Sequence, residues 1–289
     1  MRSRSKSGTS LVLVLVVVAV LVSLIGGATA LVSTRTRLLE DHAQQIRLRT
    51  LAEQGLAQAA RNLIDADTNG WDSLDETWGA YQKFSHFPES SHCADFRPGD
   101  KFELQIEDEY GRVGMTNGTL RCEEDLLLPE NLVSAASGEF PSRMIKTCSF
   151  TTCYTDGTIN LNTISKEAFF LLCSRAENHP QEYDPESGAP LPSSAAAETL
   201  WNRLESIRFR GGVFHRSTAE EALRIFQEYP TGVPPSATEV TLLGRLQPYL
   251  RSQGGMFRLT ARVSHGRNRV LLQVVYERTT HRIVRWAEM

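Results

Sequence analysis

The 289-residue sequence lacks an excess of basic charge, because 31 Lys and Arg residues stand against 34 Asp and Glu residues, for a formal net charge of −3. General affinity for nucleic acid needs a basic surface, so we expect no nucleic-acid partner. The sequence also lacks the G-x-S-x-G elbow, the P-loop and the H-E-x-x-H motif, which mark common hydrolase, nucleotide and zinc sites. We therefore predict that the protein is not an enzyme.

Charge is missing altogether from residues 11–32, which form one apolar run. These 22 residues make a helix of roughly 33 Å, which is enough to cross the core of a bilayer. Arg2, Arg4 and Lys6 precede the run. A basic flank of this kind predicts an N-terminus in the cytoplasm and a body outside it.

Three interpretations of the basic N-terminus and the apolar run stay open. The first is a removable signal peptide that ends at Ala28-Thr29-Ala30, and the second is a plain signal anchor. The third is a prepilin leader, because Lys6-Ser7-Gly8 is followed at once by the apolar run. Prepilin peptidase would then cut the bond between Gly8 and Thr9, and the apolar helix would stay on the mature protein.

Cysteine is scarce, and its number, five, is odd. A body outside the cytoplasm allows disulfides, but at least one thiol is then left over. Cys148 and Cys153 are close enough in sequence to close a small loop, while Cys93 and Cys122 flank a predicted strand. These two pairs are the disulfide candidates, and Cys173, in an apolar helical stretch, is expected to be a buried thiol.

Proline is absent from residues 35–64, where Gly55 is the only glycine. Apolar residues recur there at spacings of three and four, which predicts a helix with one apolar stripe. They are Leu48, Leu51, Ala52, Leu56, Ala59, Ala60 and Leu63. Residues 11–64 thus read as one long helix that continues from the apolar run onto a globular body.

The remaining sequence predicts strands on both sides of a mainly helical stretch. Alternating polar and apolar residues predict strands at 101–107, 256–264, 270–278 and 283–286, with a hairpin turn at 265–268. Val113 is predicted to begin a strand that returns after the first of these. Helices are predicted at 163–173, 195–208, 217–228 and 237–252.

The predicted fold class is α+β, with the long N-terminal helix packed on a small antiparallel sheet and a helical domain inserted between the strands. The expected division of the chain is a leader at 1–8, the helix at 9–64, the first α+β part at 65–115, the inserted domain at 116–255 and the closing strands at 256–289.

Asp65, Asp67, Asn69 and Glu76 match the calcium-loop template D-x-[DN]-x-[DN]-G-x5-E, with Gly70 at the turn position. Alternate side-chain oxygens could converge on one cation, and the final glutamate could bind through both oxygens. The competing interpretation is a polar, solvated turn that ends the long helix. Calcium is therefore a candidate cofactor.

Asp108 and Glu109 could be read as an acid–base pair. Adjacent residues of a strand point to opposite faces, so the two carboxylates do not easily share one site. A charged turn at the end of a strand is the simpler interpretation.

Several segments, in this order, resemble the K-type minor pseudopilin of type II secretion systems, the general secretion pathway protein K family. The segment at 50–56 is similar to the end of the family's long helix, and 72–78 resembles its Leu-Asp-Glu-x-Trp loop. Residues 108–113 resemble its Asp-Glu-x-Gly-Lys-Ile strand, and 156–163 resemble its Ile-Asn-x-Asn-Thr motif. Phe214, Ser217 and Thr218 resemble its Phe-x-Ser element with one extra residue; residues 116–155 and 176–194 match poorly.

This resemblance implies a pseudopilin fold and a structural role at the tip of a secretion fibre. It implies the I-type and J-type minor pseudopilins and the major pseudopilin as partners, and cleavage and methylation by prepilin peptidase. The location implied is the bacterial inner membrane, with a single pass and the body in the periplasm. Counting from Thr9, the fifth mature residue is Leu13, where major pseudopilins hold a glutamate that K-type subunits lack.

A second function stays open: a membrane-tethered, helix-hairpin-helix-like nucleic-acid-binding protein of a competence or type IV pilus-like system. Residues 159–163, followed by helices, resemble such modules, and Arg208, Arg210, Gly211 and Gly212 could contact a phosphate backbone. The glycine-bearing hairpin of those modules is missing, however, because a long acidic loop follows the helix at 163–173.

Overall fold

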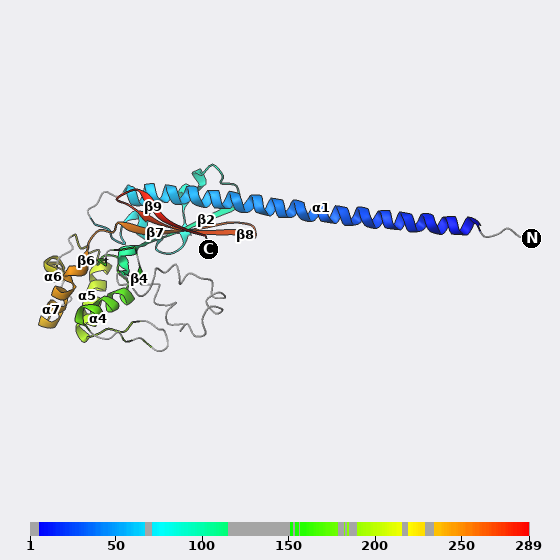
Figure 1. The fold of residues 1–289 in the computed structure, drawn as a ribbon. Helices are drawn as coiled ribbons and strands as arrows, with labels where there is room; N and C mark the ends of the chain where they lie inside the picture. Colours follow the sequence, from blue (N-terminus) through cyan, green and yellow to red (C-terminus); the bar gives the residue numbers. More distant parts are fainter. Residues whose placement is uncertain are drawn as a thin grey trace, which may run out of the picture.

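The computed structural model describes residues 6–66, 71–114, 151–152, 154–155, 157–178, 182, 184, 190–215, 219–228 and 234–288. One long helix extends from a body that contains an antiparallel sheet and a block of shorter helices (Figure 1). The sheet lies along the last part of the long helix, and the helical block lies at the end of the molecule remote from the N-terminus. This α+β architecture is the fold class that the sequence predicts.

The long helix α1 spans Lys6–Ala59 and continues into a π-helical turn at Ala60–Asp65. Its side chains are exposed over residues 13–43, and burial begins at Leu48. From there the predicted stripe faces the sheet: Leu48, Leu51, Ala52, Leu56, Ala59, Ala60 and Leu63 are all buried. The prediction of one continuous helix with a single apolar stripe is confirmed.

The main sheet has five antiparallel strands in the order β1-β2-β7-β8-β9. Their bounds are β1 (Ser85–His86), β2 (Asp100–Asp108), β7 (Met256–His265), β8 (Asn268–Glu277) and β9 (Arg282–Glu288). β2 and β7 are distant in sequence, yet they pair from Asp100 opposite His265 to Asp108 opposite Phe257. The predicted hairpin is confirmed, since His265 pairs with Asn268 across a two-residue turn in which Gly266 has φ +58°.

The first core lies between α1 and the sheet. Alternate residues of β2, Phe102, Leu104 and Ile106, are fully buried against the helix. A Cβ atom added to Gly55 would lie 2.3 Å from the ring of Phe102. This glycine therefore allows the helix to approach the sheet closely.

A helical block is inserted between β2 and β7. It contains α4 (Lys166–Glu177), α5 (Ala195–Phe209), α6 (Ala219–Glu228) and α7 (Ala237–Leu246). Ser165, Ser194 and Ser236 cap α4, α5 and α7 by accepting a hydrogen bond from a backbone N–H of the first turn. The predicted helix at 237–252 is too long, because Pro248 lies in a 3-10 turn that follows α7.

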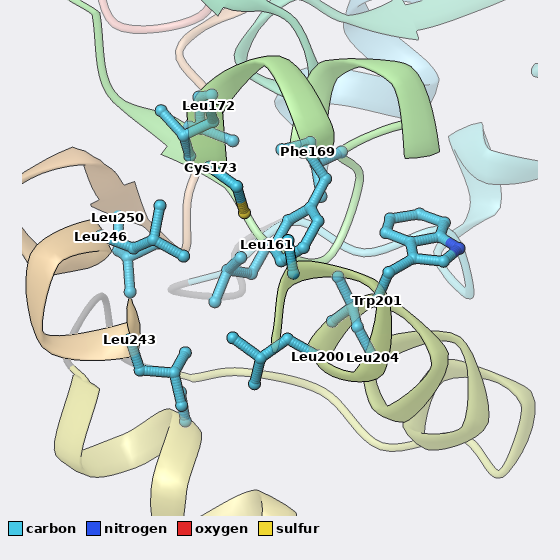
Figure 2. Packing of buried hydrophobic residues seen from close by; sticks show 14 of the residues in the cluster. Leu161, Phe169, Leu172, Cys173, Leu200, Trp201, Leu204, Leu243, Leu246 and Leu250 are labelled. Carbon is cyan, nitrogen blue, oxygen red and sulfur yellow. The ribbon is translucent and has the colours of Figure 1, made fainter. Parts of the chain in front are cut away.

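The helical block has a hydrophobic core of its own. Figure 2 shows side chains of α4, α5 and α7 meeting there, with Phe169 and Trp201 on facing helices and Leu250 at the edge. A buried ion pair adds to this packing, since Arg203 Nε of α5 lies 2.7 Å from Glu239 Oε1 of α7. The block is therefore a separately packed unit attached to the sheet.

Two short parallel pairings lie where the chain enters and leaves the block. β3 (Val113–Gly114) pairs with β4 (Thr151–Thr152), and β5 (Ile159–Asn160) pairs with β6 (Leu250–Arg251). The prediction that Val113 begins a return strand is wrong. Val113 pairs in parallel with Thr151, because the 3-10 turn Glu109–Gly111 directs the chain away from β2.

Candidate functional site: an exposed helix and a buried polar junction

The apolar part of α1 is the most exposed hydrophobic surface that the structure describes. Leu13 is 68% exposed, and Leu15, Val22 and Leu24 are exposed to a similar degree. The helix is long and apolar enough to cross a membrane. A surface of this kind is unstable in water and needs lipid or other helices around it.

The few polar side chains of this segment are satisfied within the helix itself. Ser23 Oγ donates to Ala19 O at 2.9 Å, and Thr29 Oγ1 donates to Ile25 O at 2.8 Å. A hydroxyl bonded to the preceding turn needs no partner in the hydrocarbon. The segment can therefore lie in lipid without leaving these polar groups unpaired.

Exposed apolar residues continue between this segment and the body. Leu38, Leu39 and Ile46 are 64%, 69% and 54% exposed. These side chains lie outside a membrane-length segment and remain largely exposed. They give α1 an apolar surface on which neighbouring helices could pack.

A second feature is a buried polar junction between the sheet and the helical block, formed by Asp72, Asp108, Asn160 and Thr163. Asp108, at the end of β2, accepts hydrogen bonds from Asn160 Nδ2 at 3.0 Å and Thr163 Oγ1 at 2.7 Å. Its other oxygen accepts from the Tyr110 N–H at 2.9 Å. The junction thus ties the first strand of the sheet to the segment that leads into α4.

Asp72 completes the junction from the loop after α1. Its carboxylate accepts from Arg278 Nη1 at 2.7 Å and from the Gly254 N–H. Its backbone oxygen accepts from Asn160 Nδ2 at 3.0 Å. Asn160 therefore bridges two carboxyl-bearing residues that are distant in sequence.

The environment of Asp108 favours its protonated form. Complete burial, and then the nearby charge of Asp72, raise the pKa of Asp108 to about 7, although its three hydrogen bonds act in the opposite direction. One negative charge, on Asp72, is matched by Arg278. The second carboxyl group has only neutral donors as hydrogen-bond partners in the described residues.

Glu109 is buried beside the junction and has partners of its own. Its carboxylate lies 2.6 Å from Arg258 Nε of β7 and accepts from Thr152 Oγ1. Asp108 and Glu109 have different partners. The charged turn that the sequence predicts at the end of the strand is present, since β2 ends at Asp108 and Glu109 begins the 3-10 turn, but both side chains are buried.

Two glycines make room for the junction. A Cβ on Gly254 would lie 2.5 Å from a carboxylate oxygen of Asp108, and a Cβ on Gly111 would lie 2.9 Å from the backbone oxygen of Thr163. The segments at 72–78, 108–113 and 156–163, which carry the sequence resemblance, therefore meet at one place. Asp108 and Thr163 of the junction also line a cavity of about 210 Å³.

The calcium candidates are divided between the described and undescribed parts of the chain. Asp65 Oδ2 accepts from Tyr276 Oη at 2.6 Å and lies 3.1 Å from His281 Nδ1, while Glu76 Oε2 accepts from Trp78 Nε1 at 2.6 Å. Asp67 and Asn69 lie outside the described residues, so the calcium loop stays a prediction. Among the residues that are described, no cluster of three or more His, Cys, Asp or Glu side chains is placed to hold a metal ion.

The cysteines are only partly described. Cys93 is a half-buried free thiol whose Sγ donates to Gln58 Oε1 at 3.5 Å. Cys122, Cys148 and Cys153 lie outside the described residues, so both disulfide pairs stay predictions. Cys173 is a buried free thiol in α4, as the sequence predicts, and burial raises its pKa well above the usual range.

The structure also places residues that are predicted for peptidase cleavage and for contact with nucleic acid. Gly8 and Thr9 lie in the first turns of α1, and cleavage between them stays a prediction. Arg208, a candidate for contact with nucleic acid, is directed inward and donates to the backbone oxygens of Ile164 and Leu161. Because it fixes the end of α5 to the junction, it is not available to a phosphate backbone.

Comparison with solved structures finds a chain of similar shape. A chain in the crystal structure of the GspK–GspI–GspJ complex, from the type 2 secretion system of enterotoxigenic Escherichia coli, is similar at 10% identity and a TM-score of 0.48. The alignment covers 88% of this chain and 99% of that chain. At this identity and TM-score, the likeness adds nothing to the architecture described above. No protein-family model and no curated protein matches the sequence.

Proposed function

We propose that this protein is a minor pseudopilin, a structural subunit that acts in protein export by assembling with other pseudopilins at the tip of a type II secretion fibre. The observation that carries the proposal is the build of α1. One uninterrupted helix is exposed and apolar over residues 13–32, and the same helix then packs its last turns onto an antiparallel sheet. A plain anchor does not need the membrane-spanning helix to be part of the folded core.

The tip position is supported by the sequence resemblance and by the residue at position 13. Major pseudopilins carry a glutamate as fifth mature residue, which pairs with the N-terminal amine of a neighbour. Here Leu13 takes that place and is exposed. A subunit with no neighbour above it does not need this carboxylate, which is strongly unfavourable in lipid when unpaired.

The helical block adds bulk at the end of the body that is remote from the membrane segment (Figure 1). It is well packed and is joined to the sheet through the buried polar junction. A block held in this way can present a fixed outer surface to partners beyond the fibre. We propose the I-type and J-type subunits as neighbours on the side of α1.

Co-purification tests this proposal. The full chain, extracted in detergent after coexpression with I-type and J-type pseudopilins, is expected to purify with both. Substitution of the exposed Leu39 and Ile46 by Glu should weaken that association, because it places charge on the apolar surface of α1. Substitution of Leu39 and Ile46 by Met is the matched control and should leave association unchanged. Failure of the unmodified chain to associate contradicts the proposal.

Calcium binding at Asp65, Asp67, Asn69 and Glu76 is a further part of the proposal. Oδ1 of Asp65 is buried and accepts no hydrogen bond from the described residues, so one carboxylate oxygen is available to a cation. Added calcium should raise the unfolding temperature of the full chain, and Asp67→Asn should remove that rise. An equal response to magnesium, or none to calcium, contradicts a calcium loop.

A further inference from the structure

The β7–β8 hairpin turns at the end of the body that lies nearest to the apolar part of α1. β8 runs beside α1, and at its far end Tyr276 Oη lies 2.6 Å from Asp65 Oδ2. At the near end, Arg47 binds Asp100 at 2.7 Å, and Asp100 pairs with His265 at the base of the turn. Figure 1 shows this end of β8 extending under α1 toward the N-terminus.

Basic residues gather at this turn. Lys101, Arg267 and Arg269 are exposed, and Lys101 pairs with Ser264 one residue before the base of the turn. We call these three residues the hairpin tip. None of them forms an ion pair with another described residue.

The neighbouring part of α1 adds to this charge. Arg35 and Arg37 are exposed, and the acidic residues between them and the body are Glu40 and Asp41. With Arg47 and Arg97, the membrane-facing end carries seven basic residues against the four acidic residues Glu40, Asp41, Asp95 and Asp100, whereas the whole chain has a net charge of −3. This local reversal of charge favours an anionic partner on the side of the membrane segment.

The length of α1 gives the distance between the hairpin tip and the membrane. If the hydrocarbon ends near Val32, Arg47 lies about 22 Å further along the helix. The headgroup layer occupies about 5–7 Å of that distance, and the hairpin extends back from the level of Arg47. A tilt of about 20°, which is average for membrane helices, lowers the tip further. The remaining gap is comparable with the Debye length of about 8–10 Å.

We propose that the hairpin tip docks the body against anionic lipid headgroups of the membrane that holds α1. Lys101, Arg267 and Arg269 face the headgroups, while Arg35 and Arg37 lie within the headgroup layer itself. This docking fixes how the body is oriented above the membrane before the subunit enters a fibre. The inference rests on the proposed membrane insertion of α1.

Energy transfer in vesicles tests the docking. The full chain, with a fluorescent unnatural amino acid in place of Asn268, is reconstituted in phosphatidylcholine vesicles with or without one third of phosphatidylglycerol. Both kinds of vesicle contain an acceptor-labelled lipid. We expect about twofold more transfer in the anionic vesicles, since each basic residue near such a surface is attracted to it. The difference should vanish in 1 M salt, where the Debye length falls to about 3 Å.

Charge reversal supplies the matched control. Arg267→Glu with Arg269→Glu should reduce transfer to the level of the neutral vesicles. Lys166→Glu with Arg245→Glu, on exposed positions of the remote helical block, should leave transfer unchanged. Equal transfer in both vesicle compositions, or full transfer in the hairpin variant, overturns the docking. A chain that alkaline carbonate extracts from both vesicles overturns the anchoring itself, and the docking with it.

Discussion

Burial favours the protonated form of the Asp108 carboxyl group, so we expect the stability of the protein to depend on pH. Burial, and then the charge of Asp72, place its pKa at about 7, against a usual value of 3.8. Since the folded pKa is above the unfolded one, the stability that this group contributes is complete below about pH 4 and is lost as pH rises through 7. We expect the unfolding temperature, followed by circular dichroism, to fall between pH 6 and pH 8.

Two variants test whether Asp108 causes this pH dependence of the unfolding temperature. Asp108→Asn cannot ionise, so its unfolding temperature should change less over the same pH range. Asp75→Asn, on an exposed residue of a neighbouring loop, should behave like the unmodified protein. An unchanged slope in Asp108→Asn contradicts the assignment of this proton to the junction.

Arg47 and Asp100 form a buried ion pair whose carboxylate is held in its charged form, in contrast to Asp108. Burial acts to raise the pKa of Asp100, but hydrogen bonds from Arg47, the Arg97 N–H and His265 hold it at about 2. Arg47→Ala leaves that carboxylate buried with only the Arg97 N–H and His265 as partners, and should reduce the free energy of unfolding by about 3–5 kcal/mol. Arg49→Ala removes two exposed pairs, with Glu53 and with Glu288, and should cost less than about 1 kcal/mol. Equal losses in urea unfolding contradict this distinction.

The sequence locates the junction residues but not their burial. Asp72, Asp108 and Asn160 all belong to segments that carry the family resemblance. Read locally, however, Asp108 and Glu109 have the pattern of a charged turn. Whether a carboxylate at the end of a strand is solvated depends on what covers it, and here the cover is supplied by residues about 50 positions later in the chain. Spacing along one segment carries no information about such a contact.

Gly55 and Gly244 both lie within helices, but Gly55 is buried and Gly244 is exposed. A Cβ at Gly55 would lie 2.3 Å from the Phe102 ring, whereas a Cβ at Gly244 meets nothing within 4 Å. Gly55→Ala should therefore destabilise the fold by about 1–3 kcal/mol through overpacking. Gly244→Ala should stabilise it by about 0.5–1 kcal/mol, because Ala is the better helix former. Urea unfolding of both variants measures the difference, and a stabilising Gly55→Ala contradicts the close packing of α1 on β2.

Elements with strong periodicity are predicted well from the sequence. The stripe from Leu48 to Leu63 and the hairpin around Gly266 lie where their patterns place them. β1 is missed, because its two residues, Ser85 and His86, are polar and too short to show alternation. β1 forms because it pairs with Leu104 and Glu103 of β2. A local sequence pattern carries no information about such a tertiary contact.

At the scale of the whole molecule, the order of elements predicts the architecture. Strands on both sides of a helical stretch imply one sheet with an insertion, and β2 does pair with β7 across about 150 residues of chain. The sequence does not predict how the block is fixed to the sheet. That depends on two-residue parallel pairings, β3 with β4 and β5 with β6, and on the buried polar junction.

A position at the fibre tip predicts a distinctive labelling pattern. In fibres assembled with the other pseudopilins, gold-labelled antibody against the helical block should mark one end of each fibre. The bulk of that block (Figure 1) is suited to an end and not to a repeating shaft. Label that repeats along the shaft contradicts the tip position but leaves the assembly role intact.

Assembly into a fibre requires that the apolar helix stay on the mature protein, and the N-terminal residue of the mature protein shows whether it does. After coexpression with a prepilin peptidase, mass spectrometry and N-terminal sequencing should give a chain that starts at Thr9, so that the whole exposed part of α1 described here remains attached to the sheet. A chain that starts at Leu31 would contradict the account, since signal peptidase would have removed the helix on which assembly depends. An uncut Met1 would likewise contradict it and leave a plain membrane anchor.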